Sequence, residues 1–469
     1  MDKRHVFLFI VILLIAGSLR FYQATEPFNG HYAWKEVQHA SMSQSMLKSG
    51  DPLDTSTHWL CRSNNVLLPS WFIIGSWSLF GTGELATRLP FILMGIGTAV
   101  LIFFIAQLLF DKRAAFLAFF FASISAYLAY FGRASQGESP MMFFTVLSVY
   151  LYLKFRQDGS YWYLVTSALS LTLAGLNKMP AIFVFGVYCI DQVIYHRKIF
   201  NKKVVSTVIA SFAFSLPVIA FAIIASMNAV CDIWGIDAFF NFSIMLKPFF
   251  YFLKGFEIFA WTSVVFIPIL LVHAYRLVKY KLYNHTNYQF IYLWLFMSLL
   301  MLVVISGMSY GNAYYVLVAY PPIIILAAAE MSNIADNWKK TYALLLISIA
   351  LLGLISCFYI FYITYPYKEA GLYVQGMGVD HFYRAGSPAP CYYADIPCTK
   401  IVFHQVYEIE PGEVFSLGSL NHRLMTDEQR AYLDSEFTLI HTIVGQNNLV
   451  GGDFKLKKEN DYELILIKK

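Results

Sequence analysis

Long apolar runs separated by short polar turns fill roughly the first three quarters of the chain. A run of about 20 apolar residues is long enough for a helix to cross a hydrocarbon core of roughly 30 Å. We therefore predict a mostly α-helical, polytopic membrane protein with about eleven transmembrane helices. The predicted spans are residues 5–22, 86–109, 114–131, 139–155, 161–176, 179–195, 204–226, 255–275, 289–307, 313–330 and 341–364.

Two apolar segments need separate interpretation. No small-residue cleavage site follows the first span, so we expect it to be retained as a helix. The stretch Val66–Phe80 is shorter than a span, and it contains Trp71 and Trp77. Because tryptophan favours the headgroup level, we expect this stretch to be interfacial or re-entrant.

The lysine and arginine positions orient the spans. Cytoplasmic loops carry an excess of these residues, and with the N-terminus inside, every cytoplasmic turn is basic while the outer turns are poor in charge. An odd number of spans then places the C-terminus outside. The basic turns contain Lys3/Arg4, Lys112/Arg113, Lys154/Arg156, Arg197/Lys198/Lys202/Lys203, Arg276/Lys279/Lys281 and Lys339/Lys340.

The pattern changes at about residue 366, where the long apolar runs stop. Three later segments are rich in β-branched and aromatic residues, as strands are. Thr426 with Gln429 forms a capping box for a short helix that reaches about Leu433. We predict a transmembrane domain (1–365) with a long first outer loop (23–85), followed by a small extracytoplasmic α+β domain (366–469). The predicted strands are Ile401–Ile409, Phe437–Val444 and Tyr462–Ile467.

The cysteines divide by compartment. Cys391 and Cys398 lie close together in a Pro-rich outer loop, where an oxidising environment permits a disulfide, and the sequence leaves open whether they are bonded. Cys189 and Cys357 lie in predicted spans, so we expect packing roles. Cys61 and Cys231 are also on the outer side.

Composition supports the membrane assignment and narrows the partners. The chain is 58% hydrophobic and only 13% charged, whereas a soluble domain has about 25% charged residues. The net charge of +5 reflects membrane-flanking Lys and Arg. We find no nucleic-acid motif and no Gly-rich loop for a nucleotide.

Polar clusters gather in the predicted outer turns. The first loop contains GHYAWKEVQH with Glu36. FGRASQGES carries Arg133 and Glu138, and GLNKMP carries Lys178. A fourth turn, SYGNAYY, carries Tyr310, Tyr314 and Tyr315. Because ionisable residues at span ends are costly, their convergence on one face marks a candidate functional site.

These residue types suit transfer of a glycosyl group from a lipid phosphate. Arg133 and Lys178 could stabilise the phosphate that gains charge as the anomeric bond breaks. The acceptor hydroxyl needs a base within hydrogen-bond reach. Glu36 and Glu138 are the candidates for that base, and the sequence does not decide between them.

Each candidate also has a structural explanation. Glu36 could pair with Lys35 in solvent, and Arg133 and Lys178 could snorkel to headgroups. Glu138 could cap the helix that follows it. The tyrosines could form an interfacial aromatic belt, and Trp34 is most simply an interfacial anchor. His31 and His39 with Glu36 could bind a metal, but their spacing matches no firm ligand pattern, so we predict no metal site.

The motifs resemble those of the polytopic GT-C glycosyltransferases of the protein O-mannosyltransferase and lipid A aminoarabinose transferase superfamily. WKEVQHASMSQSML resembles the family's W-R-Q/E-A-x-x-A-x-x-A helix, and GTGELATRLP, with Glu84 and Arg88, resembles G-x-x-E-x-x-x-R-L-P. The turn from Arg133 to Glu138 is similar to R-x-x-x-x-E/D, and residues 177–180 are similar to T-K-G-P. Residues 314–322 resemble Y-Y-x-L-x-x-Y-P-P.

The sequence departs from the family in two places. The K/E-P-P-L-Y-Y-W segment is here NNVLLPSW, which lacks the charged lead residue, although Arg62 lies nearby. The first loop has one acid, Glu36, where some members have an Asp-Glu pair, so a metal-dependent mechanism is not supported.

The resemblance implies an inverting transferase that uses a polyprenyl-phosphate sugar on the outer face of a bacterial plasma membrane. It implies that Glu36 is the base, that Arg133 and Lys178 hold the phosphate, and that Glu138 orients a partner or the acceptor. It implies no nucleotide and no certain cofactor; a divalent metal stays open. The acceptor is a glycan, a lipid or a protein. The substrate-binding candidates are Trp34, His39, Arg62, Glu84, Arg88, Tyr314 and Tyr315.

A flippase for a polyprenyl-linked sugar is the main alternative, because it also needs cations for a lipid phosphate. Transporters usually place polar groups at mid-membrane depth and show repeats. Here the charges lie at span ends and on one face, which favours surface chemistry.

Overall fold

The computed structural model describes most of the chain as two compact units, which we treat separately. The first unit contains residues 1–22, 61–69 and 88–357, and the second contains residues 23–60, 70–87 and 358–469. Most of the first outer loop (23–60 and 70–85) therefore groups with the C-terminal residues, and 61–69 group with the first unit. The described residues are 2–28, 33–54, 67–196, 201–227, 267–282, 285–306, 317–361, 366–385, 389–394, 396, 398–400, 403–418, 425–444, 450–451, 455–456 and 462–469.

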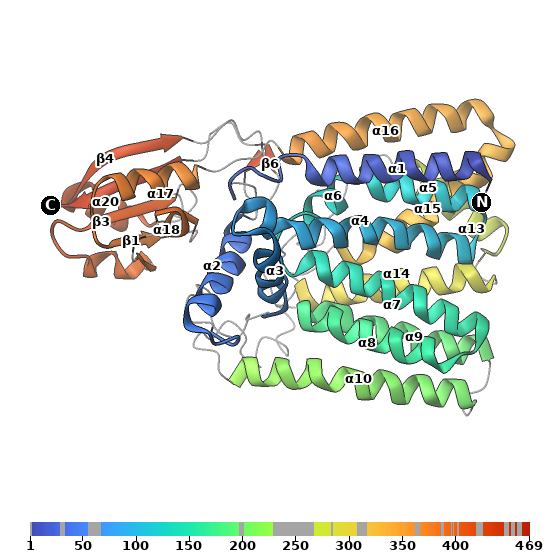
Figure 1. Cartoon of the computed structure of the whole chain (residues 1–469). Coiled ribbons are helices and arrows are strands. Elements are labelled where there is room, and N and C mark those ends of the chain that lie inside the picture. The colour runs from blue at the N-terminus through green and yellow to red at the C-terminus, as the bar shows by residue number, and fades with distance from the viewer. Residues whose placement is uncertain are drawn as a thin grey trace. The chain divides into compact units, whose positions relative to one another are not determined.

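The first unit is a bundle of long helices that lie side by side (Figure 1). Each predicted span overlaps one or two described helices, and parts of the spans 255–275, 289–307, 313–330 and 341–364 lie outside the described residues. Among the described residues, five helices are long and apolar enough to cross a membrane: α1, α4, α10, α15 with its preceding turn, and α16. The bounds are α1 Lys3–Phe21, α4 Glu84–Leu109, α5 Lys112–Ile124, α6 Ala126–Phe131, α7 Glu138–Asp158, α8 Tyr161–Asn177, η2 Met179–Ile182, α9 Phe183–His196, α10 Lys202–Met227, α13 Ile267–Lys279, α14 Thr286–Ser306, α15 Tyr320–Asn337 and α16 Lys339–Phe361.

One predicted span is broken. Residues 114–131 form two helices because Ser125 is extended (φ −65°, ψ 113°) and its hydroxyl accepts a hydrogen bond from the Leu128 amide as the N-cap of α6. Serine competes for backbone hydrogen bonds in this way, which suits caps better than helix interiors. The break shortens the span and leaves α6 to lead into the Arg133 turn.

The basic helix ends meet at one end of the bundle. Arg113 at the start of α5 pairs with Asp336 at the end of α15. The Asn287 amide at the start of α14 donates to the Leu109 carbonyl at the end of α4 at 2.6 Å, and the His5 and Phe116 rings stack 5.5 Å apart. This gathering is what the alternation of basic turns predicts. That this end is cytoplasmic stays a prediction.

The second unit combines helices with a five-stranded sheet of order β2-β1-β3-β7-β4 (Figure 1). β1 pairs in parallel with β2 and β3, while β7 is antiparallel to β3 and β4. The buried side chains of Phe415, Leu417 and Phe437 belong to one of its core clusters. The bounds are α2 Ala33–Ser49, α3 Leu67–Phe80 (whose first residues belong to the first unit), α17 Tyr367–Gly376, β1 Phe382–Ala385, α18 Ala389–Ala394, β2 Cys398–Lys400, η6 Phe403–Glu408, β3 Val414–Gly418, α20 Asp427–Glu436, β4 Phe437–Val444, β5 Val450–Gly451, β6 Lys455–Leu456 and β7 Tyr462–Lys468.

Most of the C-terminal predictions are confirmed and one is wrong. β4 and β7 match the predicted strands, and the capping box of Thr426 and Gln429 starts α20. The predicted strand Ile401–Ile409 is instead the 3₁₀ helix η6 over its described part. Val406 in this helix and Ile409 directly after it are both buried in the core cluster.

The structure contains the disulfide between Cys391 of α18 and Cys398 of β2. Cys189 and Cys357 are free thiols, and the Cys357 thiol donates to the Ile124 carbonyl, which confirms a packing role for Cys357. Cys61 and Cys231 lie outside the described residues.

We predict that Cys398→Ser lowers the free energy of unfolding of the C-terminal domain by about 2–3 kcal/mol, because the disulfide restricts the unfolded chain. Hydrogen exchange of the β1 and β3 peptides, recorded at increasing urea concentration on the full chain, measures this free energy of unfolding. Cys189→Ser removes a thiol from the other unit and should leave these peptides unchanged. Equal protection in Cys398→Ser and wild type would contradict the prediction.

Candidate functional site

Two turns of the first unit bring three predicted site residues to one end of the bundle. The Arg133 guanidinium donates to the carbonyl of Tyr22, where α1 has just ended. The Lys178 ammonium forms a salt bridge with the Glu138 carboxylate. The turns at Arg133 and Lys178, predicted separately from sequence, are therefore neighbours of the ends of α1, α7 and α8.

Helix ends explain where the ion pair forms. Glu138 is the first residue of α7, and Lys178 follows the last residue of α8 in extended conformation (φ −164°). The helix dipole stabilises an acidic side chain at a helix N-terminus and a basic side chain at a C-terminus, because each meets a partial charge of opposite sign. The Glu138 side chain is 2% exposed and the Lys178 side chain 16%. The N-cap of α7 is Gly137, so Glu138 is not the capping residue.

Glycines allow these turns to approach. A Cβ atom placed on Gly137 would lie 2.7 Å from the Asn177 carbonyl oxygen. A Cβ on Gly95 of α4 would overlap the backbone of Gly132. The Ser139 hydroxyl then ties the start of α7 to α4 by donating to the Phe91 carbonyl at 2.9 Å. Backbone-to-backbone contact therefore fixes the two turns that carry the charges.

Arg20, near the end of α1, is a functional candidate that the sequence analysis missed. It is fully buried. Its guanidinium donates to carbonyls of Ala16 at 3.1 Å, Ser123 at 3.4 Å and Ala122 at 3.3 Å. The last two belong to the C-terminal turn of α5, whose dipole end is negative. Arg20 of α1 thus caps the C-terminal end of α5. The sequence did not identify it because it lies inside a predicted apolar span.

Gln136, in the turn between Arg133 and Glu138, was also missed. Its side chain is fully buried. In the described part of the chain, neither its amide oxygen nor its amide nitrogen has a hydrogen-bond partner. A buried polar group left unsatisfied costs about 1–3 kcal/mol. The amide therefore holds hydrogen-bonding capacity that a ligand could use, and only its burial, which sequence does not reveal, identifies it.

The second unit contains the other acidic candidate. Glu36 lies in the first turn of α2 and is 4% exposed. The Lys35 ammonium lies 5.5 Å from the ring centroid of the half-buried Trp34. The His39 side chain is buried, and its carbonyl accepts hydrogen bonds from Ser43 at 2.7 Å and Ser70 at 3.3 Å. Glu36 is thus a buried carboxylate on a helix that α3 holds.

The remaining candidates are only partly described. Glu84 is the half-buried first residue of α4, and Arg88, one turn later, is 2% exposed. Arg62, Tyr314 and Tyr315 lie outside the described residues. Among the described residues, no group of three or more His, Cys, Asp or Glu side chains could hold a metal ion.

Comparison with known sequences gives a family over part of the chain. Residues 64–225 match the model of the family described as dolichyl-phosphate-mannose-protein mannosyltransferase. This range includes Glu84, Arg88, Arg133, Glu138 and Lys178. A protein of Aquifex aeolicus is 29% identical over 180 residues, which cover 38% of this chain and 35% of that protein. The chain therefore matches only about a third of that relative's length.

Comparison with solved structures gives the fold over the whole chain. ArnT from Cupriavidus metallidurans, in the apo state, has a TM-score of 0.59 at 12% identity, with 97% of each chain covered. Its structure bound to undecaprenyl phosphate gives a TM-score of 0.59 at 13% identity, with 99% of this chain and 98% of that chain covered. The Archaeoglobus fulgidus oligosaccharyltransferase, tethered to an acceptor peptide, gives 0.56 at 12% identity over 85% of this chain and 64% of that chain. These matches show that the chain shares its fold with these proteins.

We predict that Glu138 and Lys178 are energetically coupled. Glu138→Gln or Lys178→Met alone should lower the free energy of unfolding by about 2–4 kcal/mol, because each leaves a poorly solvated charge. The double variant should cost at least about 1 kcal/mol less than the sum. Chemical unfolding in detergent, followed by circular dichroism, measures this. The more exposed pair Lys154–Asp158 is the control, with coupling of about 0.5 kcal/mol or less. Additive losses at Glu138 and Lys178 would contradict the prediction.

Proposed function

We propose that the protein is an integral-membrane inverting glycosyltransferase. It moves a hexose or pentose from a polyprenyl-phosphate donor to a hydroxyl or phosphate of a glycan, lipid or protein acceptor. The observation that carries this proposal is the convergence of Arg133, Glu138 and Lys178 at one end of the bundle. The family match over these residues supports it, as do related folds solved with undecaprenyl phosphate and with a dolichol-phosphate and an inhibitory peptide. The proposed location is the outer face of a bacterial plasma membrane.

The leaving phosphate is the reason for the cations. As the bond between the anomeric carbon and the phosphate oxygen breaks, that oxygen takes the electron pair and gains negative charge. Preorganised cations lower the energy of that state more than the energy of the bound donor. Lys178 can turn from Glu138 toward the phosphate. The Tyr22 carbonyl holds the Arg133 guanidinium in place by accepting its hydrogen bond.

Glu36 is the base in this proposal. The acceptor oxygen attacks the anomeric carbon opposite the phosphate, which inverts its configuration, and the acceptor proton passes to a carboxylate. Glu138 already faces the Lys178 ammonium, and a neighbouring positive charge makes a carboxylate a weaker proton acceptor. Glu138 then orients Lys178, and Glu36 is the carboxylate to which we assign proton transfer.

The other candidates bind substrate in this proposal. Aromatic side chains stack on sugars and on isoprenoid tails through their apolar faces, and arginines pair with phosphate oxygens. No cofactor is needed for these steps. The residues assigned to substrate binding are Trp34, His39, Arg62, Glu84, Arg88, Tyr314 and Tyr315.

We predict that Glu36→Gln lowers the transfer rate by about 10²–10⁴-fold, because loss of a general base has an effect of this size. The assay follows label from a radiolabelled polyprenyl-phosphate sugar into acceptor in membranes, with donor binding measured separately. Asp51→Asn, which changes an exposed carboxylate of the same unit, should transfer label at the wild-type rate.

Two outcomes would change the assignment. If Glu36→Gln is as active as wild type and Glu138→Gln is inactive, Glu138 is the base. If the wild-type protein moves the labelled lipid across the bilayer and releases no sugar from it, the protein is a flippase and the transferase proposal is wrong.

We predict that Gln136→Leu weakens donor binding about 5- to 100-fold without loss of stability. Removing an unsatisfied buried amide is neutral or stabilising, whereas removing one that bonds to ligand costs about 1–3 kcal/mol of binding. The readouts are KM for the donor and thermal unfolding of the ligand-free protein. A lower unfolding temperature with unchanged KM would mean that Gln136 is structural.

A further inference from the structure

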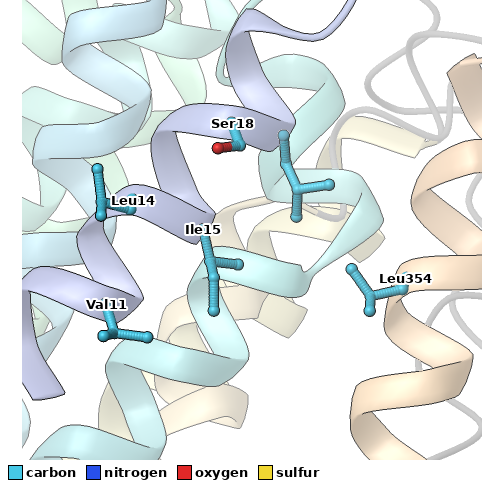
Figure 2. Close-up of a pocket in the computed structure, with 6 residues that line it drawn as sticks. Val11, Leu14, Ile15, Ser18 and Leu354 are labelled. Atoms are coloured by element: carbon cyan, nitrogen blue, oxygen red, sulfur yellow. The ribbon is translucent and has the colours of Figure 1, made fainter.

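A groove runs along the first unit between α1 and α16, away from the turns that carry Arg133 and Lys178. It consists of two adjoining cavities that share the side chains of Val11 and Ile15. The larger has a volume of about 740 Å³ and lies at the basic end of the bundle, and the smaller, about 360 Å³, continues toward Ser18. Figure 2 shows Val11, Leu14, Ile15 and Ser18 of α1 and Leu354 of α16, which line this smaller cavity.

The attachment of α16 explains why the groove exists. α16 packs closely on the C-terminal end of α5 through Gly353 and Cys357, which both contact Ile124. Nearer its start, α16 lines the groove with Tyr342 and Leu346 instead. The floor between α1 and α16 comes from α5, with Phe116, Leu117 and Phe120. Beyond its mouth, the groove is therefore apolar.

The mouth of the groove is polar, with two acidic and two basic residues. Its two acids are already engaged, because Asp336 pairs with Arg113 and Asp111 caps α5 and accepts from the Ser332 hydroxyl at 3.0 Å. Lys112 also lines the mouth, and it forms no ion pair or hydrogen bond with any residue that the structure describes.

One helix end adds positive potential at this mouth. α1, α5 and α16 all begin here, but Asp2 and Asp111 cap α1 and α5, whereas α16 has no acidic residue in its first turn. Lys339 begins α16 and, like Lys112, has no ion-pair partner in the described ranges. The positive end of the α16 dipole therefore adds to the charge of the two lysines.

We propose that this groove binds an anionic phospholipid of the leaflet at the basic end. The phosphate sits near Lys112 and Lys339, and an acyl chain lies along Val11, Ile15 and Phe120. The site does not depend on the proposed transferase activity.

The dimensions favour a lipid over a helix of a partner. From His5 to Ile15 the larger cavity is about 15 Å long at 1.5 Å per residue, which is half of a roughly 30 Å hydrocarbon core. A helix segment of that length and a 10–12 Å diameter would occupy about 1,200–1,700 Å³. The larger cavity holds about 740 Å³, which suits a chain-like ligand.

Native mass spectrometry of the full chain with phosphatidylglycerol and phosphatidylcholine tests the proposal. Wild type should retain more phosphatidylglycerol than phosphatidylcholine. Lys112→Glu should reduce its retention about fivefold or more, since one basic residue near a membrane surface contributes about 1 kcal/mol to anionic lipid binding. Ile15→Trp, which fills the cavity, should reduce it similarly.

Two matched controls separate this site from general lipid attraction. Phe7→Trp adds bulk at a 69% exposed position of α1 that lines neither cavity. Lys202→Glu reverses a charge at the start of α10, away from the groove. Neither should change retention. The proposal is overturned if Lys202→Glu loses as much phosphatidylglycerol as Lys112→Glu, if folded Ile15→Trp binds normally, if both lipids are retained equally, or if a second copy of the chain is retained instead.

Discussion

The cost of placing charge among apolar helices is the constraint on which this structure depends. A charge far from water is tolerated only when a partner, a dipole or several carbonyls replace its hydration. Glu138 and Lys178 meet this condition together. The acid lies at the positive N-terminal end of the α7 dipole, the base lies at the negative C-terminal end of the α8 dipole, and the two form an ion pair. A polar site in such a bundle is therefore built where helices end, and glycine contacts bring those ends together.

The opposite end of the first unit obeys the same rule with a different result. Arg156 pairs with the buried Asp191 at 3.3 Å, and Glu330 accepts from Arg276 at 2.6 Å and contacts His273 at 3.1 Å. Each of these acids has its charge matched inside the bundle, so the networks hold helices together. The amide of Gln136 has no such match among the described residues. An amide with both polar atoms unpaired among the described residues thus distinguishes the Gln136 turn from these charge pairs.

Sequence predicted what depends on local pattern and missed what depends on packing. Hydropathy located the helices because span length follows from membrane thickness, and the turns with Arg133 and Lys178 followed from charges at span ends. The break at Ser125 was missed because an extended serine changes hydropathy very little. The predicted strand at 401–409 was wrong because β-branched and aromatic residues suit any half-buried surface, including one face of a 3₁₀ helix. The pairing of Glu138 with Lys178 needs the close approach at Gly137, which no linear pattern contains.

Arg20 shows how one side chain links these features. A guanidinium has five donors in a fixed fork, so it can bond several carbonyls from one position, which a lysine ammonium does less well. Arg20 uses this to bond Ala122 and Ser123, the last turn of α5 before the break at Ser125. A Cβ on Gly132 would lie 3.1 Å from its Nε atom, so the start of the Arg133 turn packs directly against it. Arg20 thus holds together the end of α1, the break after α5 and the turn that carries Arg133. Backbone carbonyls replace the hydration of its charge.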